Sequence, residues 1–375
     1  MTGSLINPRP QFCISPAKHE EYRRTKFEGG ELLLTLVGGL GQCAVVPKSM
    51  AGWNAARAVA VLRLKDASNA RFLRLCLLSR PLQYLMNAWA NTTVQATLNL
   101  KEIRQLPVPW PPKHERRLIA HAVGTLDSKI ELNTRMNETL EAIAQGLYKF
   151  WFIDTTQGGP PNGWHEGRFG NLTEFLGGYA FKSKDWIEQG VPVVKIGSVK
   201  PGIVDLTEVT FVSDQVAAEA KRFRLSAGDL LVGMTGYVGE VGLVPPTDNP
   251  PLLNQRVGKF VLEKPGTSGL GFLYCLTRRR GFKAEVEAKS HGTAQANVSA
   301  EGILSIPILV PPKDLRDKFN RICEPILNRI LVNHAESHTL AALRDTLLPK
   351  LLSGEIRLRG LKVQENILES VPMMK

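Results

Sequence analysis

The chain has 375 residues, of which 43% are hydrophobic, and a formal net charge of +12. This length is typical of two or three domains, each able to bury a core, and the composition is that of a globular protein. No run of 18 apolar residues is present and the N-terminal segment lacks the apolar stretch of a signal peptide, so the sequence predicts neither a membrane span nor export.

The cysteines and charges indicate the cellular compartment and the kind of binding partner. The five cysteines are scattered without a Cys-x-x-Cys pair or a Cys/His metal spacing, which predicts reduced thiols in a cytoplasmic protein. The basic balance favours an anionic partner, nucleic acid first. Residues 12–112 hold 13 Lys/Arg against 6 Asp/Glu, but residues 170–312 hold 15 against 14. If residues 170–312 bind DNA, a few Lys and Arg side chains at specific positions must make the contacts, because this region has no large net positive charge.

The chain repeats itself at a distance of about 200 residues. Gly38 and Gly41 match Gly236 and Gly239 at an offset of 198, and Pro107 matches Pro307 at 200. The offset drifts by only two residues over more than a hundred, and the period is too long for a solenoid repeat. The sequence therefore predicts a duplicated module.

The first part of each copy is predicted to be rich in strands. Short apolar runs at residues 32–37 and 59–62 correspond to runs at 230–232 and 257–262. Gly38 and Gly236 each end such a run, which is typical of a turn because glycine adopts positive φ without steric cost. Helical stretches over residues 71–89 and 271–289 follow, and then a strand that leads into a proline pair.

The second part of each copy is predicted to be one long helix. Residues 113–153 would span on the order of 60 Å at 1.5 Å per residue, and their apolar residues recur in steps of three and four. The second helix is expected from Lys313 to about residue 352, with Pro349 predicting an early end or a kink. The residues predicted to form the spacer and subunit interface are Leu126, Ile130, Asn133, Leu140, Leu147 and Trp151 in the first helix and Ile326, Ile330, Asn333, Leu340 and Leu347 in the second.

Neither helix can bury this seam alone. The natural solution is an intramolecular antiparallel pair, with Asn133 and Asn333 fixing its register; the alternative is that each helix packs on its own module. The predicted fold class is α/β (α+β), with two tandem modules that carry small twisted sheets, separated and followed by long helices pairing as an antiparallel coiled coil. The expected boundaries are 1–112, 113–155, 156–312, 313–358 and a tail at 359–375, with a Gly/Pro-rich linker at 157–164.

The sequence contains only incomplete matches to known catalytic motifs. The run from Asp248 to Leu252 resembles the Asn-Pro-Pro-aromatic motif of amino-methyltransferases but has Leu252 in place of the aromatic residue. Glu287 and Lys289 have nuclease-like spacing but lie in a predicted helix, and no phosphate-binding loop for ATP is present. These observations indicate a binding protein without an active site.

Several stretches, in order, resemble the DNA-specificity subunit of type I restriction–modification enzymes. Residues 107–115, 126–133 and 147–152 resemble its central conserved region. Residues 178–183 and 190–197 look like the opening of a target-recognition domain, and residues 340–355 look like the C-terminal conserved region. The resemblance implies a non-catalytic subunit without cofactors of its own. It implies two domains that read the halves of a bipartite target in double-stranded DNA, with two methyltransferase subunits and a restriction/motor subunit docked on the helices.

The residues expected to bind DNA recur in the two copies or lie in polar loops. Tyr237 offers a ring, Gly236 a backbone amide, and Arg256 a bidentate guanine contact. Asn54 and Arg57 are matched with Asn254 and Arg256, although such recurrence also suits a role in stabilising the fold. The full set is Lys182, Lys195, Gly236, Tyr237, Gln255, Arg256, His291, Thr293 and Gln295 in the second copy, and Arg57 and Gln95 in the first.

The first copy departs from the second. About 49 residues separate Asn162 from Phe211, but only 11 precede the matching Phe12, so the first module is expected to be short by some 40–50 residues, with unpaired strand edges. The competing hypotheses are a coiled-coil scaffold that does not read DNA and a stand-alone nuclease or methyltransferase. Salt-dependent DNA binding distinguishes a DNA-reading subunit from a scaffold that does not read DNA. Cleavage or methyl transfer by the chain alone would reveal a stand-alone nuclease or methyltransferase.

Overall fold

The structure is a computed structural model that describes residues 12–90, 96–262, 269–290 and 296–358. It divides into two compact units, unit 1 with residues 1–132 and 337–375 and unit 2 with residues 133–336. Each unit therefore contains one strand-rich module and a part of each long helix.

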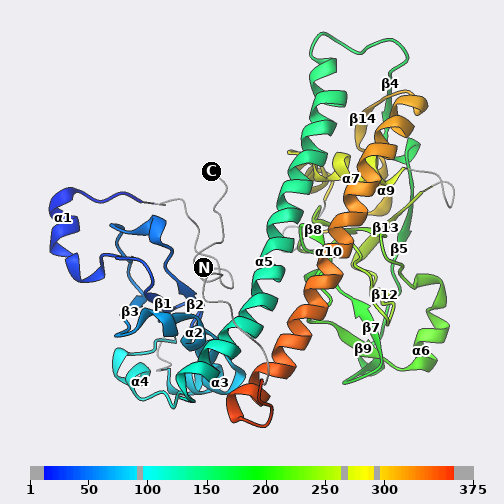
Figure 1. Cartoon of the computed structure of the whole chain (residues 1–375). Coiled ribbons are helices and arrows are strands. Elements are labelled where there is room, and N and C mark those ends of the chain that lie inside the picture. Colours follow the sequence, from blue (N-terminus) through cyan, green and yellow to red (C-terminus); the bar gives the residue numbers. More distant parts are fainter. Residues whose placement is uncertain (1–11, 91–95, 263–268, 291–295, 359–375) are drawn as a thin grey trace. The chain divides into compact units, whose positions relative to one another are not determined.

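The module of unit 1 is a small sheet followed by short helices. Strands β1 (Leu32–Thr35), β2 (Cys43–Val45) and β3 (Val59–Leu62) form an antiparallel sheet in the order β2-β1-β3. Helix α1 (Pro16–Glu21) precedes the sheet, and α2 (Ala70–Leu78), α3 (Arg80–Trp89) and α4 (Leu100–Arg104) follow it (Figure 1).

The core of unit 1 joins the sheet to both long helices. Leu32 and Leu34 alternate with Leu33 along β1, so they face the helices, where they meet Phe72 of α2. The same cluster takes in Ile119 and Val123 from α5 (Lys113–Tyr148) and Leu348 and Leu351 from α10 (Lys313–Ser353). The start of α5 and the end of α10 are thus fixed to this module.

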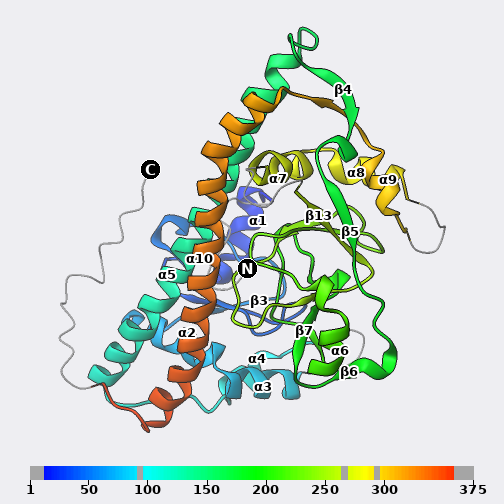
Figure 2. The same cartoon turned by 90° about the vertical axis from the view of Figure 1, so that its right-hand side faces the viewer.

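Unit 2 has a larger module with three sheets (Figure 2). A five-stranded sheet has the order β5-β13-β10-β11-β8, a four-stranded sheet has the order β12-β7-β9-β6, and β14 pairs with β4. The strands are β4 (His165–Arg168), β5 (Glu174–Gly177), β6 (Trp186–Ile187), β7 (Val191–Val194), β8 (Gly202–Ile203), β9 (Thr210–Val212), β10 (Leu230–Gly233), β11 (Val241–Leu243), β12 (Leu252–Leu253), β13 (Val257–Val261) and β14 (Pro307–Val310). The helices are α6 (Asp214–Glu219), α7 (Leu270–Arg278), α8 (Phe282–Ala288) and α9 (Ala300–Leu304).

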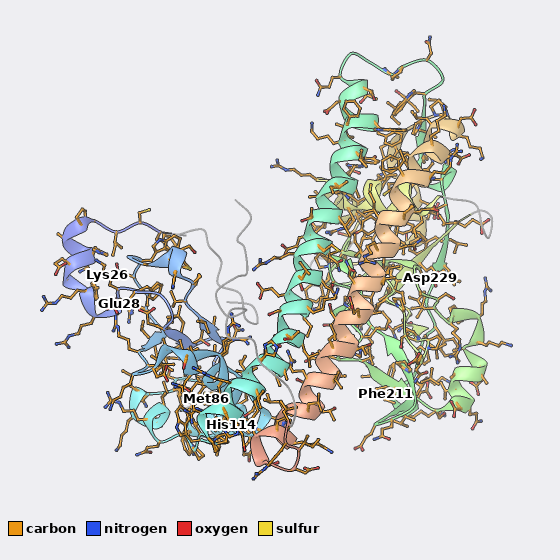
Figure 3. All side chains as sticks on the ribbon, viewed as in Figure 1. Lys26, Glu28, Met86, His114, Phe211 and Asp229 are labelled. Atoms are coloured by element: carbon orange, nitrogen blue, oxygen red, sulfur yellow. The ribbon has the colours of Figure 1, made fainter. Side chains whose placement is uncertain are left out.

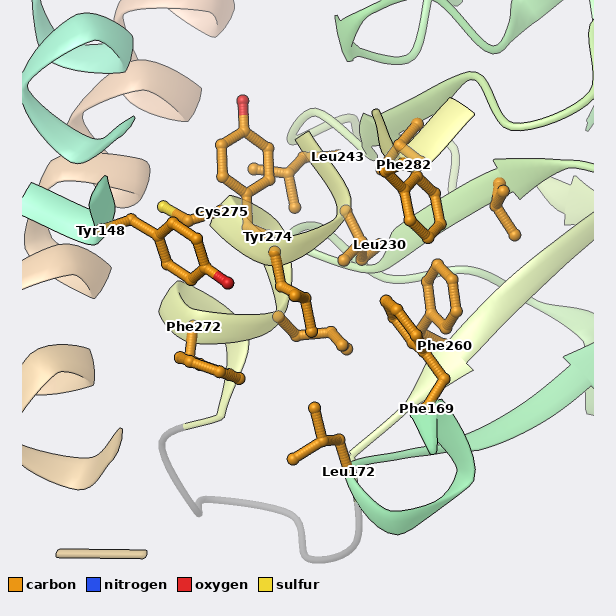
Figure 4. Close-up of a cluster of buried hydrophobic side chains, with 14 of the residues drawn as sticks. Tyr148, Phe169, Leu172, Leu230, Leu243, Phe260, Phe272, Tyr274, Cys275 and Phe282 are labelled. Atoms are coloured by element: carbon orange, nitrogen blue, oxygen red, sulfur yellow. The ribbon is translucent and has the colours of Figure 1, made fainter. Parts of the chain in front are cut away.

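An aromatic core holds this module to the helices. Phe272 and Tyr274 of α7 lie beside Tyr148 of α5, while Phe169 and Phe260 meet on the side of the sheet (Figure 4). The cluster also contains Phe319, Cys323 and Leu327 of α10. The end of α5 and the start of α10 are fixed to the second module in this way.

The long helices pair in antiparallel fashion, as predicted. In unit 2 the Asn133 side-chain amide donates to Asn333 O (3.3 Å), and the Asn137 amide donates to Ile330 O (3.2 Å). The Asn333 amide in turn donates to Asn137 Oδ1 (2.8 Å). Residue numbers rise on one helix as they fall on the other, and these polar contacts fix the register of an otherwise apolar seam.

Three local expectations are wrong. The helical stretch 71–89 is two helices broken at Ser79, because Pro81 favours a new helix start, and 271–289 breaks near Gly281, whose φ is +105°. Helix α10 does not end early at Pro349 but runs to Ser353, close to the expected end at residue 352. Asp345 is exposed, so water can satisfy the carbonyl that Pro349 leaves without an amide.

The two modules share a hydrogen-bond pattern at the offsets seen in the sequence. Gly30 N donates to Val46 O (2.8 Å) as Gly228 N donates to Val244 O (2.9 Å), and Leu98 N donates to Leu36 O (3.0 Å) as Val298 N donates to Met234 O (2.9 Å). Strands β2-β1-β3 therefore correspond to β11-β10-β13. In unit 2, β8 and β5 extend the two edges of this trio, whereas in the described part of unit 1 no strand does so.

None of the described helices combines the length and apolar character that a membrane span needs.

Candidate nucleic-acid interface

Three loops of unit 2 meet where strands β7, β12 and β10 end. Met234 N donates to Arg256 O (3.0 Å), which joins the turn after β10 to the loop between β12 and β13. Asn254 N donates to Val194 O (3.2 Å), which joins that loop to the end of β7. Five of the predicted residues, Lys195, Gly236, Tyr237, Gln255 and Arg256, are thus brought to one end of the module.

A fourth segment runs alongside the loop before β13. Tyr179 N donates to Leu253 O (2.8 Å), and Gln255 N donates to Tyr179 O (3.0 Å). Gly178 makes this approach possible, since a Cβ there would lie 2.2 Å from Asn254 O and 2.6 Å from Leu253 O. In the sequence, residues 178–183 are singled out only by resemblance, whereas the structure gives Gly178 a steric role.

The turn after β10 presents a ring but no free amide at Gly236. Gly236 N donates to Ala296 O (3.0 Å), and Tyr237 N donates to Thr235 O (3.0 Å). The prediction that Gly236 offers its backbone amide to DNA is therefore wrong, because the turn needs that hydrogen bond. The φ of Gly236 is +76°, and the tight turn leaves the Tyr237 side chain 61% exposed.

Gln255 and Arg256 are available to a ligand. Both residues are exposed, and neither side chain makes a hydrogen bond or ion pair with another residue that the structure describes. Asn254 is 7% exposed, and its Oδ1 accepts from Arg256 N (3.2 Å), so a buried side chain holds the loop. An amide and a guanidinium on a fixed loop suit hydrogen bonding to base edges.

The two predicted lysines border this site. Lys195 Nζ lies 3.7 Å from the centre of the Trp186 ring, and burial lowers the pKa of Lys195 from its ordinary value. Lys182 is exposed, and its backbone N–H donates to Asp185 Oδ2 (2.7 Å). The aromatic contacts Tyr179–Phe181 and Phe181–Trp186 connect the two segments.

The remaining predicted residues divide between unit 1 and the undescribed parts of the chain. Gln95, His291, Thr293 and Gln295 lie outside the described residues. Arg57 is exposed, but it is not the counterpart of Arg256. Leu36 N donates to Ala58 O (2.8 Å) as Met234 N donates to Arg256 O, so Ala58 corresponds to Arg256 and Arg57 to Gln255.

The pairing of Asn54 with Asn254 is also wrong. Asn54 forms an isolated antiparallel β-bridge with Lys26, and Leu252 forms the same kind of β-bridge with Arg224. Asn54 is therefore the counterpart of Leu252. The true offset here is still 198, so Asn54 matches Asn254 at 200 and Arg57 matches Arg256 at 199 only by coincidence. The two modules therefore place different side chains on the same scaffold.

Six of the predicted seam residues pack on the cores of the modules: Leu140, Leu147, Trp151, Ile326 and Ile330 in unit 2 and Leu347 in unit 1. Asn133, Ile330 and Asn333 are buried, and the other eight are partly buried. Four exposed apolar residues of the long helices recur at the 200-residue offset, whereas Ile322, which is also exposed, has the small Ala122 at that offset. Leu132 and Val332 are each 53% exposed, and Ile143 and Leu343 are each 46% exposed.

Two strand-rich modules related by duplication, an antiparallel helix pair, and exposed polar and aromatic side chains on the converging loops of unit 2 define a protein of two binding modules joined by long helices. The family model for the type I restriction modification DNA specificity domain matches residues 16–142 and 161–334. The chain therefore belongs to the family of type I restriction–modification DNA specificity subunits.

Individual relatives are distant. The MjaVIII specificity subunit of Methanocaldococcus jannaschii is 24% identical over 275 residues, which are 70% of this chain and 64% of that protein. The HindI specificity subunit of Haemophilus influenzae is 24% identical over 334 residues, covering 69% of this chain and 71% of that protein. The crystal structure of the S subunit from M. genitalium has a TM-score of 0.54 and 18% identity over 86% of this chain and 83% of that one, which shows the same fold.

Proposed function

We propose that this chain is a non-catalytic subunit that reads a bipartite target in double-stranded DNA, one half with each module. The observation that carries the proposal is the set of exposed side chains Tyr237, Gln255 and Arg256 on loops held by backbone hydrogen bonds. The counterparts in unit 1 are Gly39, Arg57 and Ala58, so the two half-targets differ in sequence. In this proposal S-adenosylmethionine, ATP and magnesium serve the partner subunits, and the chain works in the cytoplasm.

Arg256→Ala is expected to relax base preference at one position of one half-target. A bidentate Arg–guanine contact contributes about 1–3 kcal/mol of discrimination, or roughly 5- to 150-fold in affinity. Competition binding with duplexes randomised at each position measures the effect. The control is Lys318→Ala, which removes an exposed cation on α10 and should leave the preference unchanged. An unchanged preference in both variants would contradict base reading by Arg256.

We further propose that the long helices dock two copies of a methyltransferase subunit, and that a restriction/motor subunit joins this complex. The paired exposure of Leu132 with Val332 and of Ile143 with Leu343 supports two equivalent apolar faces. The first helix is close to neutral, with six Lys/Arg and five Asp/Glu in residues 113–153, which suits protein contact better than phosphate contact.

Ile143→Asp and Leu343→Asp are each expected to remove one of two methyltransferase copies, and the double variant to remove both. A buried carboxylate at either interface has no partner and is costly. The mass of the purified complex measures the stoichiometry. Ile143→Val and Leu343→Ile keep the apolar faces and should retain both copies. Two retained copies in the double Asp variant would contradict these docking sites.

A further inference from the structure

A basic triplet recurs at the same place in both modules. Arg23, Arg24 and Lys26 follow α1, and Lys221, Arg222 and Arg224 follow α6, at the offset of 198. All six residues are exposed. The second module has nearly equal numbers of acidic and basic residues, so the retention of three cations at this position is not a by-product of a basic composition.

The backbone under the two triplets is the same. Each begins with a single 3-10 turn, Arg23–Thr25 or Lys221–Phe223. Lys26 N donates to Arg23 O (3.2 Å), and Arg224 N donates to Lys221 O (3.2 Å). Because the turns are alike, the three side chains leave the two modules from corresponding backbone positions.

These cations have little neutralising contact. Arg23 lies 3.9 Å from Glu20, but both side chains are at least 70% exposed, so the attraction is weak. Among the described residues no carboxylate pairs with Arg24, Lys26, Lys221, Arg222 or Arg224.

Backbone carbonyls hold the turns and nearby guanidinium groups in place. Arg224 Nη1 donates to Pro250 O (3.1 Å). In unit 1, Arg63 donates from its two Nη atoms to Arg24 O (2.9 Å) and Lys26 O (2.7 Å), which adds a fourth cation.

Other exposed cations of the first module do not recur. At the 198 offset, Lys48 corresponds to Pro246, Arg57 to Gln255 and Arg63 to Val261. A cation present in only one module is consistent with base reading or with solubility. A cation present at the same position in both modules is expected to contact a feature that the two half-targets share. In DNA that common feature is the phosphate backbone.

We propose that each triplet is a phosphate-contact site that holds the DNA backbone beside the reading loop of its own module. This inference rests on the proposed DNA-reading function. Arg224 forms a β-bridge with Leu252, about 5 Å away, and Arg256 follows Leu252 by four residues, so the Arg224 and Arg256 backbones are at most about 18 Å apart. The major groove is about 12 Å wide, so a reader in the groove and a cation on its rim can act from one surface.

The triplets also lie away from the long helices of their own units. Helix α6, which leads into the second triplet, is well separated from α10 in both views (Figures 1 and 2). Lys26 lies at the opposite end of unit 1 from His114, near the start of α5 (Figure 3). The second triplet is therefore set apart from α10 in its unit, and the first from the start of α5.

The test is the salt dependence of DNA binding by the full chain. The variant Lys221→Gln/Arg222→Gln/Arg224→Gln should bind a random-sequence duplex more weakly. Its plot of log affinity against log salt should be shallower by roughly two to three, since each phosphate contact contributes about 0.9 to the slope. Arg23→Gln/Arg24→Gln/Lys26→Gln should act alike. Arg222→Lys/Arg224→Lys keeps the charges and should retain the wild-type slope.

A control of equal charge separates a local contact from net charge. Lys318→Gln/Arg321→Gln/Arg329→Gln removes three exposed cations of α10 in unit 2. The proposal is overturned if this control flattens the slope as much as the triplet variants do, or if the triplet variants keep the wild-type slope. Wild-type chain that shows no salt-dependent binding would instead remove the DNA-reading function, and the triplet proposal with it.

Discussion

Asp127→Ala is expected to destabilise unit 1 by about 3 kcal/mol. Asp127 Oδ2 accepts from Arg74 Nη1 of α2 (2.8 Å), and Oδ1 accepts from Arg344 Nη1 of α10 (3.0 Å). The side chains of Asp127 and Arg74 are only 11% and 12% exposed. Alanine leaves two cations without their shared partner, and Arg74 is too buried for water to replace it.

Hydrogen exchange of the α2 amides reports on this unit without assuming that the whole chain unfolds in one step. Asp345→Ala is the matched control, since Asp345 also accepts from Arg344 (2.8 Å) but is 43% exposed. It should cost less than about 1 kcal/mol. Equal protection of α2 in the two variants would show that Asp127 does not link α2, α5 and α10.

Gly178→Ala is expected to disrupt the reading site of the second module. The new Cβ would lie 2.2 Å from Asn254 O, a backbone atom that cannot rotate away. Either the segment at Tyr179 or the loop with Gln255 and Arg256 must move. Overpacking of this kind costs about 1–3 kcal/mol in stability. We expect a lower unfolding temperature of unit 2 and at least a tenfold loss of affinity for the DNA target.

Gly177→Ala is the control, because nothing lies within 4 Å of a Cβ there. Thermal unfolding and DNA binding should match those of the wild-type chain. If Gly178→Ala behaves like Gly177→Ala in both measurements, the close backbone approach is not required for the site.

Much of the architecture could be read from local patterns. The apolar runs at Leu32 and Leu230 predicted β1 and β10, and steps of three and four predicted α5 and α10. Asn133 and Asn333 stood out because they interrupt an apolar seam, and they do contact each other across it. Such features depend on residues close together in the chain, or on a period that persists along it.

The candidate site could be predicted only as a set of separate polar positions. Their convergence depends on long-range hydrogen bonds such as those from Met234 N to Arg256 O and from Gln255 N to Tyr179 O. The same bonds show that Arg57 corresponds to Gln255, where the nearest match of residue types had suggested Arg256. The residue types alone do not show to which carbonyl oxygen a backbone N–H donates.

The sequence by itself determined the duplication, the two long helices and the family, because each is carried by spacing along the chain. Only the tertiary structure decided that the amide of Gly236 is used by Ala296, that Gly178 is needed for contact with Asn254, and that both modules keep a basic triplet on the same turn. The physical reason is that a backbone group or a charge gains its role from the neighbour it meets, and those neighbours are dozens of residues away in the chain.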